Sequence, residues 1–209
     1  MRQDAALMAS TVTERVRHEA EPSKGSRFIA TVVPVVDEAV AKEALAATRA
    51  EMPDAGHHCW AWRLAAPAID RASDDGEPSG SAGKPILAQL VGRDLVDTAV
   101  IVSRYWGGTK LGVGGLVRAY GRAAGEALDR AEAILWVAQM AATVRHDHAD
   151  TDAVTKALAA AGAADVEVFY GVAVTRLVEV PVGSEADLRR AIANATAGRA
   201  ELDVTNTSE

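Results

Sequence analysis

The chain has 209 residues, 49% of them hydrophobic, which is enough for one or two ordinary domains. Its formal net charge of −7 argues against a protein whose whole surface binds polyanions, and its single cysteine excludes an internal disulfide. No apolar run approaches the ~20 residues of a membrane span, and residues 1–19 lack the apolar core of a signal peptide. We therefore expect a cytoplasmic protein with no membrane segment.

The first half of the chain is expected to alternate strands and helices behind a frayed or weakly helical lead. β-Branched apolar runs favour strands, amphipathic alanine-rich runs favour helices, and Gly, Pro, Asp and Ser mark turns. In chain order the expected segments are the lead at 1–18, a strand at Arg27–Val36, a helix from Asp37 to about Glu51, a strand at His57–Leu64, a loop at Pro67–Ser79, a helix at Pro85–Val91, a strand at Thr98–Ser103, and a helix from Leu116 to Leu128 that extends to about Ala133.

The second half of the chain begins after a linker at Ile134–Gln139. Its strands and helices are expected in a more regular order. Strand, helix, strand, strand, helix and strand succeed one another, and this βαββαβ order predicts a ferredoxin-like domain with an antiparallel sheet. The expected segments are Met140–Arg145, Asp150–Ala161, Ala164–Tyr170, Val172–Val182, Ser184–Ala195 and Arg199–Val204, before a polar tail at Thr205–Glu209.

Two glycine-rich turns dominate the stretch from Ser73 to Arg122. Each turn leads into a helix, and a helix start offers free backbone N–H groups that favour an anion. Residues 76–122 contain six basic and three acidic residues, a balance of +3, whereas residues 138–209 contain six and eleven, a balance of −5. This asymmetry would let the first domain attract anions locally in an acidic protein.

The same stretch contains long sequence motifs that resemble those of a known family. GEPSGSAGKPIL at 76–87 and VSRYWGGTKLGVGGLVRAYG at 102–121 are similar to the signature of the IMPACT/YigZ family. Two earlier blocks, KGSRFIA at 24–30 and HHCWAWRL at 57–64, resemble that family in the right order. The likeness is close over roughly residues 19–130 and weaker beyond.

This resemblance implies a two-domain α+β protein in the cytoplasm. It implies an N-terminal Impact-type domain of βαβ type at 19–134, similar to the second domain of a small-subunit ribosomal protein, and a ferredoxin-like domain at 138–206. Eukaryotic members of the family bind proteins of the translational stress response. For bacterial members the resemblance implies binding related to nucleic acid or the ribosome.

The glycine turns supply the predicted binding site for an anion, RNA or a partner. Trp106 would stack on a base and the cations would attract phosphate. The alternative is that the glycines only let a strand turn sharply onto a helix. The spacing matches neither a Walker loop nor a dinucleotide fingerprint. The predicted residues are Arg104, Trp106, Gly107, Gly108, Lys110, Gly112, Gly114, Gly115 and Arg118 in the second turn and Glu77, Gly80, Ser81 and Lys84 around the first.

Catalytic and metal sites are weaker hypotheses. Cys59 and His57 lie two apart on one strand face, which would place their Cβ atoms ~7 Å apart and permit a dyad only with favourable rotamers. The acidic loop at 74–77 would hold Mg²⁺ or remain solvated. The spacing of His146 and His148 does not support zinc. We expect no metal and no nicotinamide or flavin cofactor.

The sequence therefore favours a non-enzymatic, translation-associated binding protein. Its partner would be RNA, the ribosome or a translation-related protein, held at the basic glycine-rich face, with an acidic surface on the second domain. The alternative is a hydrolase that uses Cys59 and His57 or the acidic loop at 74–77. A binder of small phosphate compounds is a third hypothesis.

Overall fold

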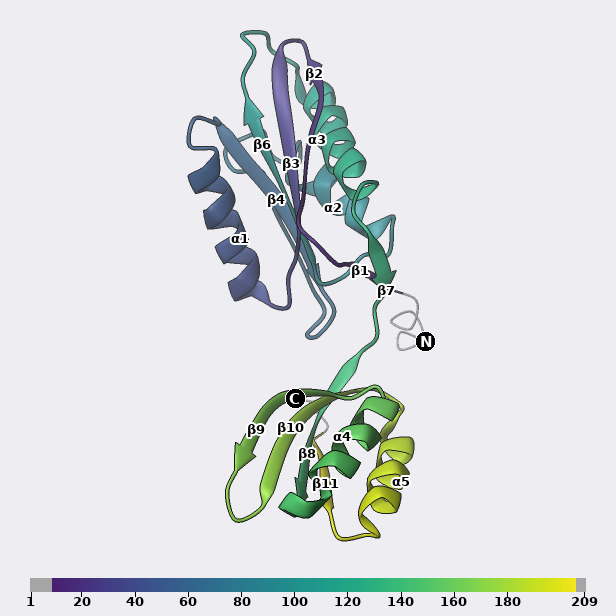
Figure 1. Ribbon diagram of the computed structural model, residues 1–209. Coiled ribbons are helices and arrows are strands. Elements are labelled where there is room, and N and C mark those ends of the chain that lie inside the picture. The colour runs from purple at the N-terminus through teal and green to yellow at the C-terminus, as the bar shows by residue number, and fades with distance from the viewer. Residues whose placement is uncertain (1–8, 206–209) are drawn as a thin grey trace. The chain divides into compact units, whose positions relative to one another are not determined.

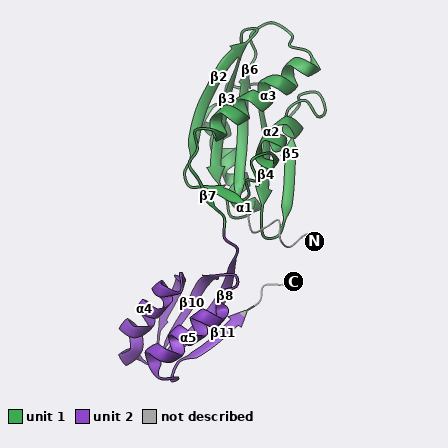
Figure 2. Ribbon diagram, turned by 90° about the vertical axis from the view of Figure 1, so that its right-hand side faces the viewer, with its two compact units in different colours: residues 1–136 green, residues 137–209 purple. Residues whose placement is uncertain are grey.

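A computed structural model describes residues 9–205, and the chain divides into two compact units, residues 1–136 and 137–209 (Figure 2). Within the described residues, no helix combines the length and the apolar character that crossing a membrane requires. The first unit begins before the predicted domain start at residue 19, because two early strands belong to it.

The first unit is a five-stranded antiparallel sheet between two helical layers. The helix α1 (Glu38–Glu51) covers one face, and α2 (Gly83–Val91) and α3 (Val113–Leu128) cover the other (Figure 1). The strand order across the sheet is β2 (Val16–Ser23), β3 (Ser26–Pro34), β6 (Thr98–Tyr105), β4 (His57–Leu64) and β5 (Ile69–Ser73).

The alternation of side chains on β4 gives each face of this sheet its own core. Cys59 and Ala61 are fully buried in the cluster with α2 and α3, whereas Trp62 and Leu64 pack in the cluster with α1. Trp60 stacks on Trp62 with ring centroids 3.8 Å apart. The two tryptophans therefore face the core on the α1 side of the sheet.

The α+β class is confirmed, and the βαβ character takes a split form. Strands β3 and β4 both pair antiparallel with β6, so they run parallel to each other with β6 between them and α1 as their crossover. Strands β5 and β6 are likewise parallel, with β4 between them and α2 as the crossover. The two crossover helices lie on opposite faces of the sheet, α1 in the cluster with Trp62 and α2 in the cluster with Cys59.

Three expectations about the first unit are wrong. Residues 10–12 form β1, which pairs with β7 (Ala133–Leu135), and residues 16–23 form β2 beside β3, so the described part of the lead is neither frayed nor helical. Residues 69–73, expected as a loop, form the edge strand β5. Helix α3 ends at Leu128, and β7 begins soon after. The expectation for residues 1–8 lies outside the described residues.

The second unit confirms the ferredoxin-like prediction. The strand order is β11 (Glu201–Thr205), β8 (Gln139–His146), β10 (Val174–Pro181) and β9 (Ala164–Tyr170), with every neighbouring pair antiparallel. Helices α4 (Thr151–Ala160) and α5 (Glu185–Thr196) pack on one face. Their core partners on the sheet are Met140, Ala142, Val144, Val178 and Val180.

Candidate functional site

Each acidic side chain of the loop at 74–77 has internal partners. The Asp74 carboxylate accepts backbone N–H bonds from Gly80, Ala82 and Gly83 at 2.7, 2.9 and 2.8 Å. Burial alone raises the pKa of Asp74, but these three donors together outweigh burial and hold it below its ordinary value. The Asp74 carboxylate thus already occupies the anion-binding position of the first glycine turn.

Asp75 ties the same loop to the first helix and to β4. Its carboxylate pairs with Arg49 at 2.7 Å and accepts the His58 backbone N–H at 2.7 Å. The loop carboxylates therefore point to different partners, and no cluster of three potential metal ligands exists among residues 9–205. This arrangement does not suit the magnesium site or the acidic-loop hydrolase considered from the sequence.

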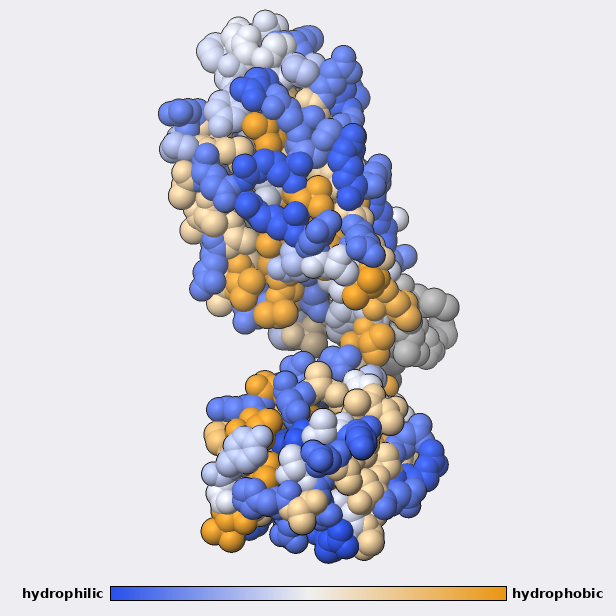
Figure 3. Space-filling model, viewed as in Figure 1, coloured by the Kyte–Doolittle hydropathy of each residue, from blue (hydrophilic) through white to orange (hydrophobic). Residues whose placement is uncertain are grey.

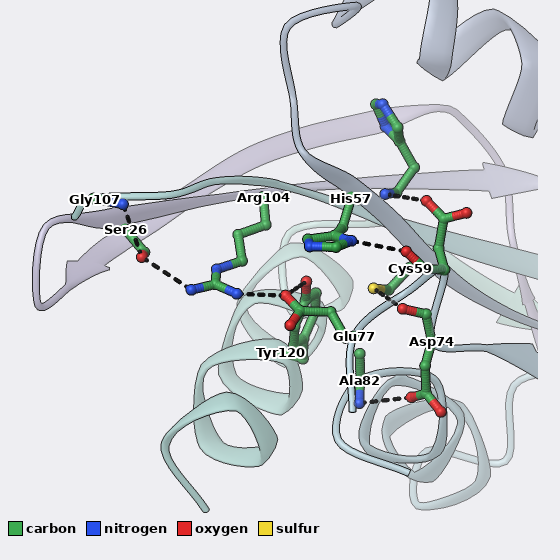
Figure 4. Close-up of polar contacts among 11 residues, drawn as sticks. Ser26, His57, Cys59, Asp74, Glu77, Ala82, Arg104, Gly107 and Tyr120 are labelled. Carbon is green, nitrogen blue, oxygen red and sulfur yellow. Dashed lines mark hydrogen bonds and ion pairs between the residues drawn. The ribbon is translucent and has the colours of Figure 1, made fainter. Parts of the chain in front are cut away.

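Glu77 forms a buried ion pair with Arg104, a partner that the sequence did not single out. The Arg104 Nη1 atom lies 2.6 Å from Glu77 Oε1, and the two side chains are only 8% and 4% exposed. The Tyr120 hydroxyl donates to the same Glu77 oxygen at 2.7 Å, and Arg104 Nη2 lies 3.3 Å from Ser26 Oγ (Figure 4). Arg104 is therefore already neutralised, and it is not the freely available cation that the sequence predicted.

Cys59 lies beneath this pair and does not have the properties of a nucleophile. Its side chain is fully buried, and its thiol donates to the Asp74 carbonyl at 3.0 Å. Burial raises the pKa of Cys59 to about 12, so the thiol keeps its proton at neutral pH. A dyad of Cys59 and His57 is thus opposed by the electrostatics of the site.

His57 is the neighbour that the binding prediction missed. Its Nδ1 contacts the Asp75 carbonyl at 2.8 Å, and because a carbonyl only accepts, Nδ1 carries the proton in this contact. The ring lies between Arg104 and the acidic loop, with the Nε2 side toward the Glu77–Arg104 pair (Figure 4). His57 lies beside Arg104 because the register of β4 and β6 pairs these two residues. Local sequence patterns do not specify that register.

The second glycine turn needs glycine for two different reasons. A Cβ at Gly107 would overlap the backbone of Gly25 in the β2–β3 hairpin, so close approach requires glycine there. Gly112, the residue before α3, has φ +74° and ψ 162°, a conformation essentially restricted to glycine. The glycines therefore have structural roles whatever ligand the turn binds.

The start of α3 leaves donors without acceptors inside the helix. Its first bond runs from the Leu116 N–H to the Gly112 carbonyl at 2.9 Å. The N–H groups of Val113, Gly114 and Gly115 precede that bond, and the Gly112 cap supplies no side-chain acceptor. This helix start differs from that of α2, whose donors are bound by Asp74.

A hollow of about 430 Å³ joins the acidic loop, the end of β6 and the start of α3; we call it the Trp106 hollow. The indole of Trp106 is 66% exposed at this hollow. Lys110 is exposed beside it, and no described carboxylate forms an ion pair with it. The lining residues are Gly56, His57, Glu77, Pro78, Arg104, Trp106, Lys110, Leu111, Gly112, Val113 and Leu116.

A second hollow of about 500 Å³ lies on the other side of Leu111; we call it the Arg118 groove. Lys24 of the β2–β3 turn, Gly115, Arg118 and Arg122 line it, and Lys24 and Arg118 are exposed. Arg122 is instead tied back to the hairpin, donating to the Glu21 carbonyl and to Ser23.

The remaining predicted site residues lie apart from these hollows. Gly80 and Ser81 belong to the turn that Asp74 closes, Ser81 is fully buried, and Lys84 is exposed on α2. Gly108 and Gly114 are exposed in the second turn and the first turn of α3 but line neither hollow. The structure thus groups Glu77, Arg104, Trp106, Lys110 and Gly112 at the Trp106 hollow and Gly115 with Arg118 at the groove.

The histidines of the second unit are also engaged internally. His146 Nδ1 lies 2.8 Å from the Asp147 carbonyl, and His148 Nε2 lies 2.9 Å from the Gly171 carbonyl. Asp150 pairs with Arg199 at 2.7 Å. These contacts fit a structural strand end better than a metal centre.

The two units match known families in the same order. The Impact N-terminal domain matches residues 24–128, and a domain of unknown function, DUF1949, matches residues 144–199. The chain is 48% identical over 111 residues to the IMPACT family member YigZ of Escherichia coli K12, covering 52% of this chain and 54% of that one. It is 44% identical over 120 residues to the IMPACT family member YvyE of Bacillus subtilis, covering 57% and 55%. The chain thus spans about half the length of the curated relatives it matches.

A solved structure extends the likeness to both units. A crystal structure of a hypothetical protein superposes with a TM-score of 0.72 at 32% identity and covers 97% of this chain and 100% of that one. The fold and the hollows define a two-unit α+β protein with a candidate binding face. The chain belongs to the IMPACT family, as its signature motifs indicate.

Proposed function

We propose that this chain is a translation-associated binding protein that holds single-stranded RNA at its second glycine turn, without catalysis. Membership of the IMPACT family supports the association with translation, which the sequence resemblance implies. The site supports the choice of RNA. The observation that carries the proposal is an exposed tryptophan at the same hollow as a helix start whose cap supplies no side-chain acceptor.

Trp106 supplies the contact to a base. A tryptophan that is 66% exposed on a soluble protein leaves a large aromatic face in water. Stacking of a base on such a face contributes about 1–3 kcal/mol and tolerates any base, since every base has a π-face. The other three tryptophans are held elsewhere: Trp60 and Trp62 stack in the α1 core, and Trp136 donates to Asp97.

The start of α3 supplies the contact to a phosphate. The N–H groups of Val113, Gly114 and Gly115 face no intrahelical acceptor, and the positive end of the helix dipole lies there. Lys110 adds a charge at the same hollow, and Lys24 and Arg118 add charge in the adjoining groove. Arg104 contributes little, because Glu77 already neutralises it.

The surroundings of the reactive groups support binding without turnover. The Cys59 thiol is buried and protonated, and the three carboxylates of the acidic loop each have internal partners. A hydrolase needs a nucleophile or an activated water that can reach the substrate. None of these groups is free to serve in that way.

The test is a titration of a 3′-labelled 12-nucleotide oligouridylate, followed by anisotropy at 50 and 200 mM salt. Trp106→Ala is expected to weaken binding by the ~1–3 kcal/mol of one stacked base at both salt concentrations. Lys110→Ala is expected to reduce the slope of log K against log salt by ~0.7, the value for one phosphate contact on a single strand.

The matched control is Lys42→Ala, which removes an exposed lysine from α1 on the opposite face of the sheet. It changes the net charge as Lys110→Ala does but touches neither hollow. Equal effects of the two lysine variants, or no binding at 50 mM salt, would reject the RNA site.

A further inference from the structure

The second unit has a sheet face that no helix of residues 9–205 covers. Side chains at alternate positions of β8 and β10 pack against α4 and α5, and the intervening positions point to the opposite face. On β8 the uncovered positions are Ala141, Thr143 and Arg145, and on β10 they are Thr175, Leu177 and Glu179. We call this surface the open face (Figure 1).

The strand register arranges the open face in rows across the four strands. One row runs Asp203, Thr143, Leu177 and Glu167, and the next runs Glu201, Arg145, Thr175 and Phe169. In a third row Glu179 stands beside Ala141. The central strands thus carry mainly small or half-buried side chains, while carboxylates occur at both borders.

The charges of the open face are unbalanced. Four carboxylates on it are exposed, Glu167, Glu179, Glu201 and Asp203, against a single cation, Arg145. Among the described residues none of the four forms an ion pair, whereas Asp165 on the helix-covered side pairs with Arg176. Like charges held together without partners cost free energy, so this surface favours a cationic partner.

The width of the face suits a helix. Neighbouring strands lie 4.7–4.9 Å apart, so Asp203 and Glu167 stand about 14 Å apart across β8 and β10. An α-helix with its side chains is about 10–12 Å wide. A helix laid over the two central strands would place its apolar stripe on Ala141, Thr143 and Leu177, with its flanks beside the carboxylates.

The β9–β10 hairpin adds an apolar end to this face. Phe169, Tyr170 and Val172 are 53%, 70% and 101% exposed, and they line a hollow of about 510 Å³ together with Arg145. Orange surface at the lower left of the second unit lies over this hairpin (Figure 3). Exposed apolar side chains next to a charged surface are typical of a site for another macromolecule.

We propose that the open face docks a basic amphipathic helix of another protein. Lysine or arginine side chains on both flanks of that helix pair with Glu167 on the β9 side and with Glu201 and Asp203 on the β11 side. Its apolar stripe covers the central strands and reaches the β9–β10 hairpin. This surface is independent of the Trp106 hollow, and the proposal does not rest on RNA binding.

The experiment uses the full chain and a labelled 18-residue helical peptide with a leucine stripe and lysine flanks. A second peptide has glutamate in place of each lysine. We expect the lysine peptide to bind and the glutamate peptide not to bind at 100 mM salt. The double variant Glu167→Lys/Asp203→Lys should weaken lysine-peptide binding at least about tenfold, since it turns attraction into repulsion at both borders.

The matched control is Asp152→Lys/Asp187→Lys, which makes the same charge change on α4 and α5, on the covered side of the sheet. Thermal melts verify that both variants are folded. Equal weakening in the two variants would overturn the proposal, because net charge alone would then explain binding. Sedimentation provides a second check. If the wild-type chain forms a dimer that Glu167→Lys/Asp203→Lys abolishes, the open face is a contact between two copies of this chain and the proposal is overturned.

Discussion

Glu77 and Arg104 show how two residues of the family signature stabilise the first unit. Both side chains are more than nine-tenths buried, so removing one charge leaves the other without a partner. Glu77→Gln, which keeps an acceptor for Tyr120, is expected to lower the free energy of unfolding by about 3–5 kcal/mol. Urea denaturation measures this loss. Adding Arg104→Met should restore part of it, and a further full loss in the double variant would contradict the pairing.

Asp74 gives a pH-dependent prediction at the same scale. Its pKa is lowered in the folded chain, so it contributes stability above its unfolded pKa of about 3.9 and loses that contribution as pH falls through the folded value. Asp74→Asn is expected to cost about 1 kcal/mol at pH 6, as other N-terminal helix caps do. The difference from wild type should shrink below about pH 4, and a difference that grows with acid would contradict this role.

At the scale of elements, the contact between the second glycine turn and the β2–β3 hairpin is a specific requirement. Gly108 has φ +84° and open space around it, so Gly108→Ala is expected to cost about 1 kcal/mol from its backbone conformation. Gly107→Ala places a methyl group against the Gly25 backbone and is expected to approach the ~3 kcal/mol of a severe overpacking. Thermal melts of the two variants compare these costs, and equal melting temperatures would contradict the close approach.

The same elements show what sequence patterns can predict. The βαββαβ order of the second unit follows from regular strand and helix lengths, and the ends of β4 and β10 were close to those predicted. Strands β1 and β5 are short, three and five residues, and β1 depends on a partner more than 100 residues away. Local patterns cannot show such a partner. They also cannot show that Glu77 neutralises Arg104, because the pairing depends on how the loop folds over β6.

At the scale of the whole molecule, each unit has its own hydrophobic core. The clusters of residues 12–131 and of residues 140–204 share no residue. All four tryptophans, at 60, 62, 106 and 136, lie in the first unit. Tryptophan fluorescence therefore reports the first unit alone, whereas far-UV circular dichroism reports both.

We expect the two signals to give non-coincident unfolding curves in urea, because separate cores can unfold separately. Circular dichroism should show an additional change in helix and strand content that fluorescence does not follow. Coincident curves from both probes would contradict independent unfolding of the two units.

The central claim is that RNA binds at Trp106 and the start of α3, and backbone and indole N–H resonances test it most directly. With ¹⁵N-labelled protein and the 12-nucleotide oligouridylate, we predict shifts of the Trp106 indole N–H and of the Val113, Gly114 and Gly115 amides. The amides of Gly80, Ala82 and Gly83 should stay in place, because Asp74 already binds them. Shifts confined to the first turn, or no shift at either turn, would contradict the proposed site.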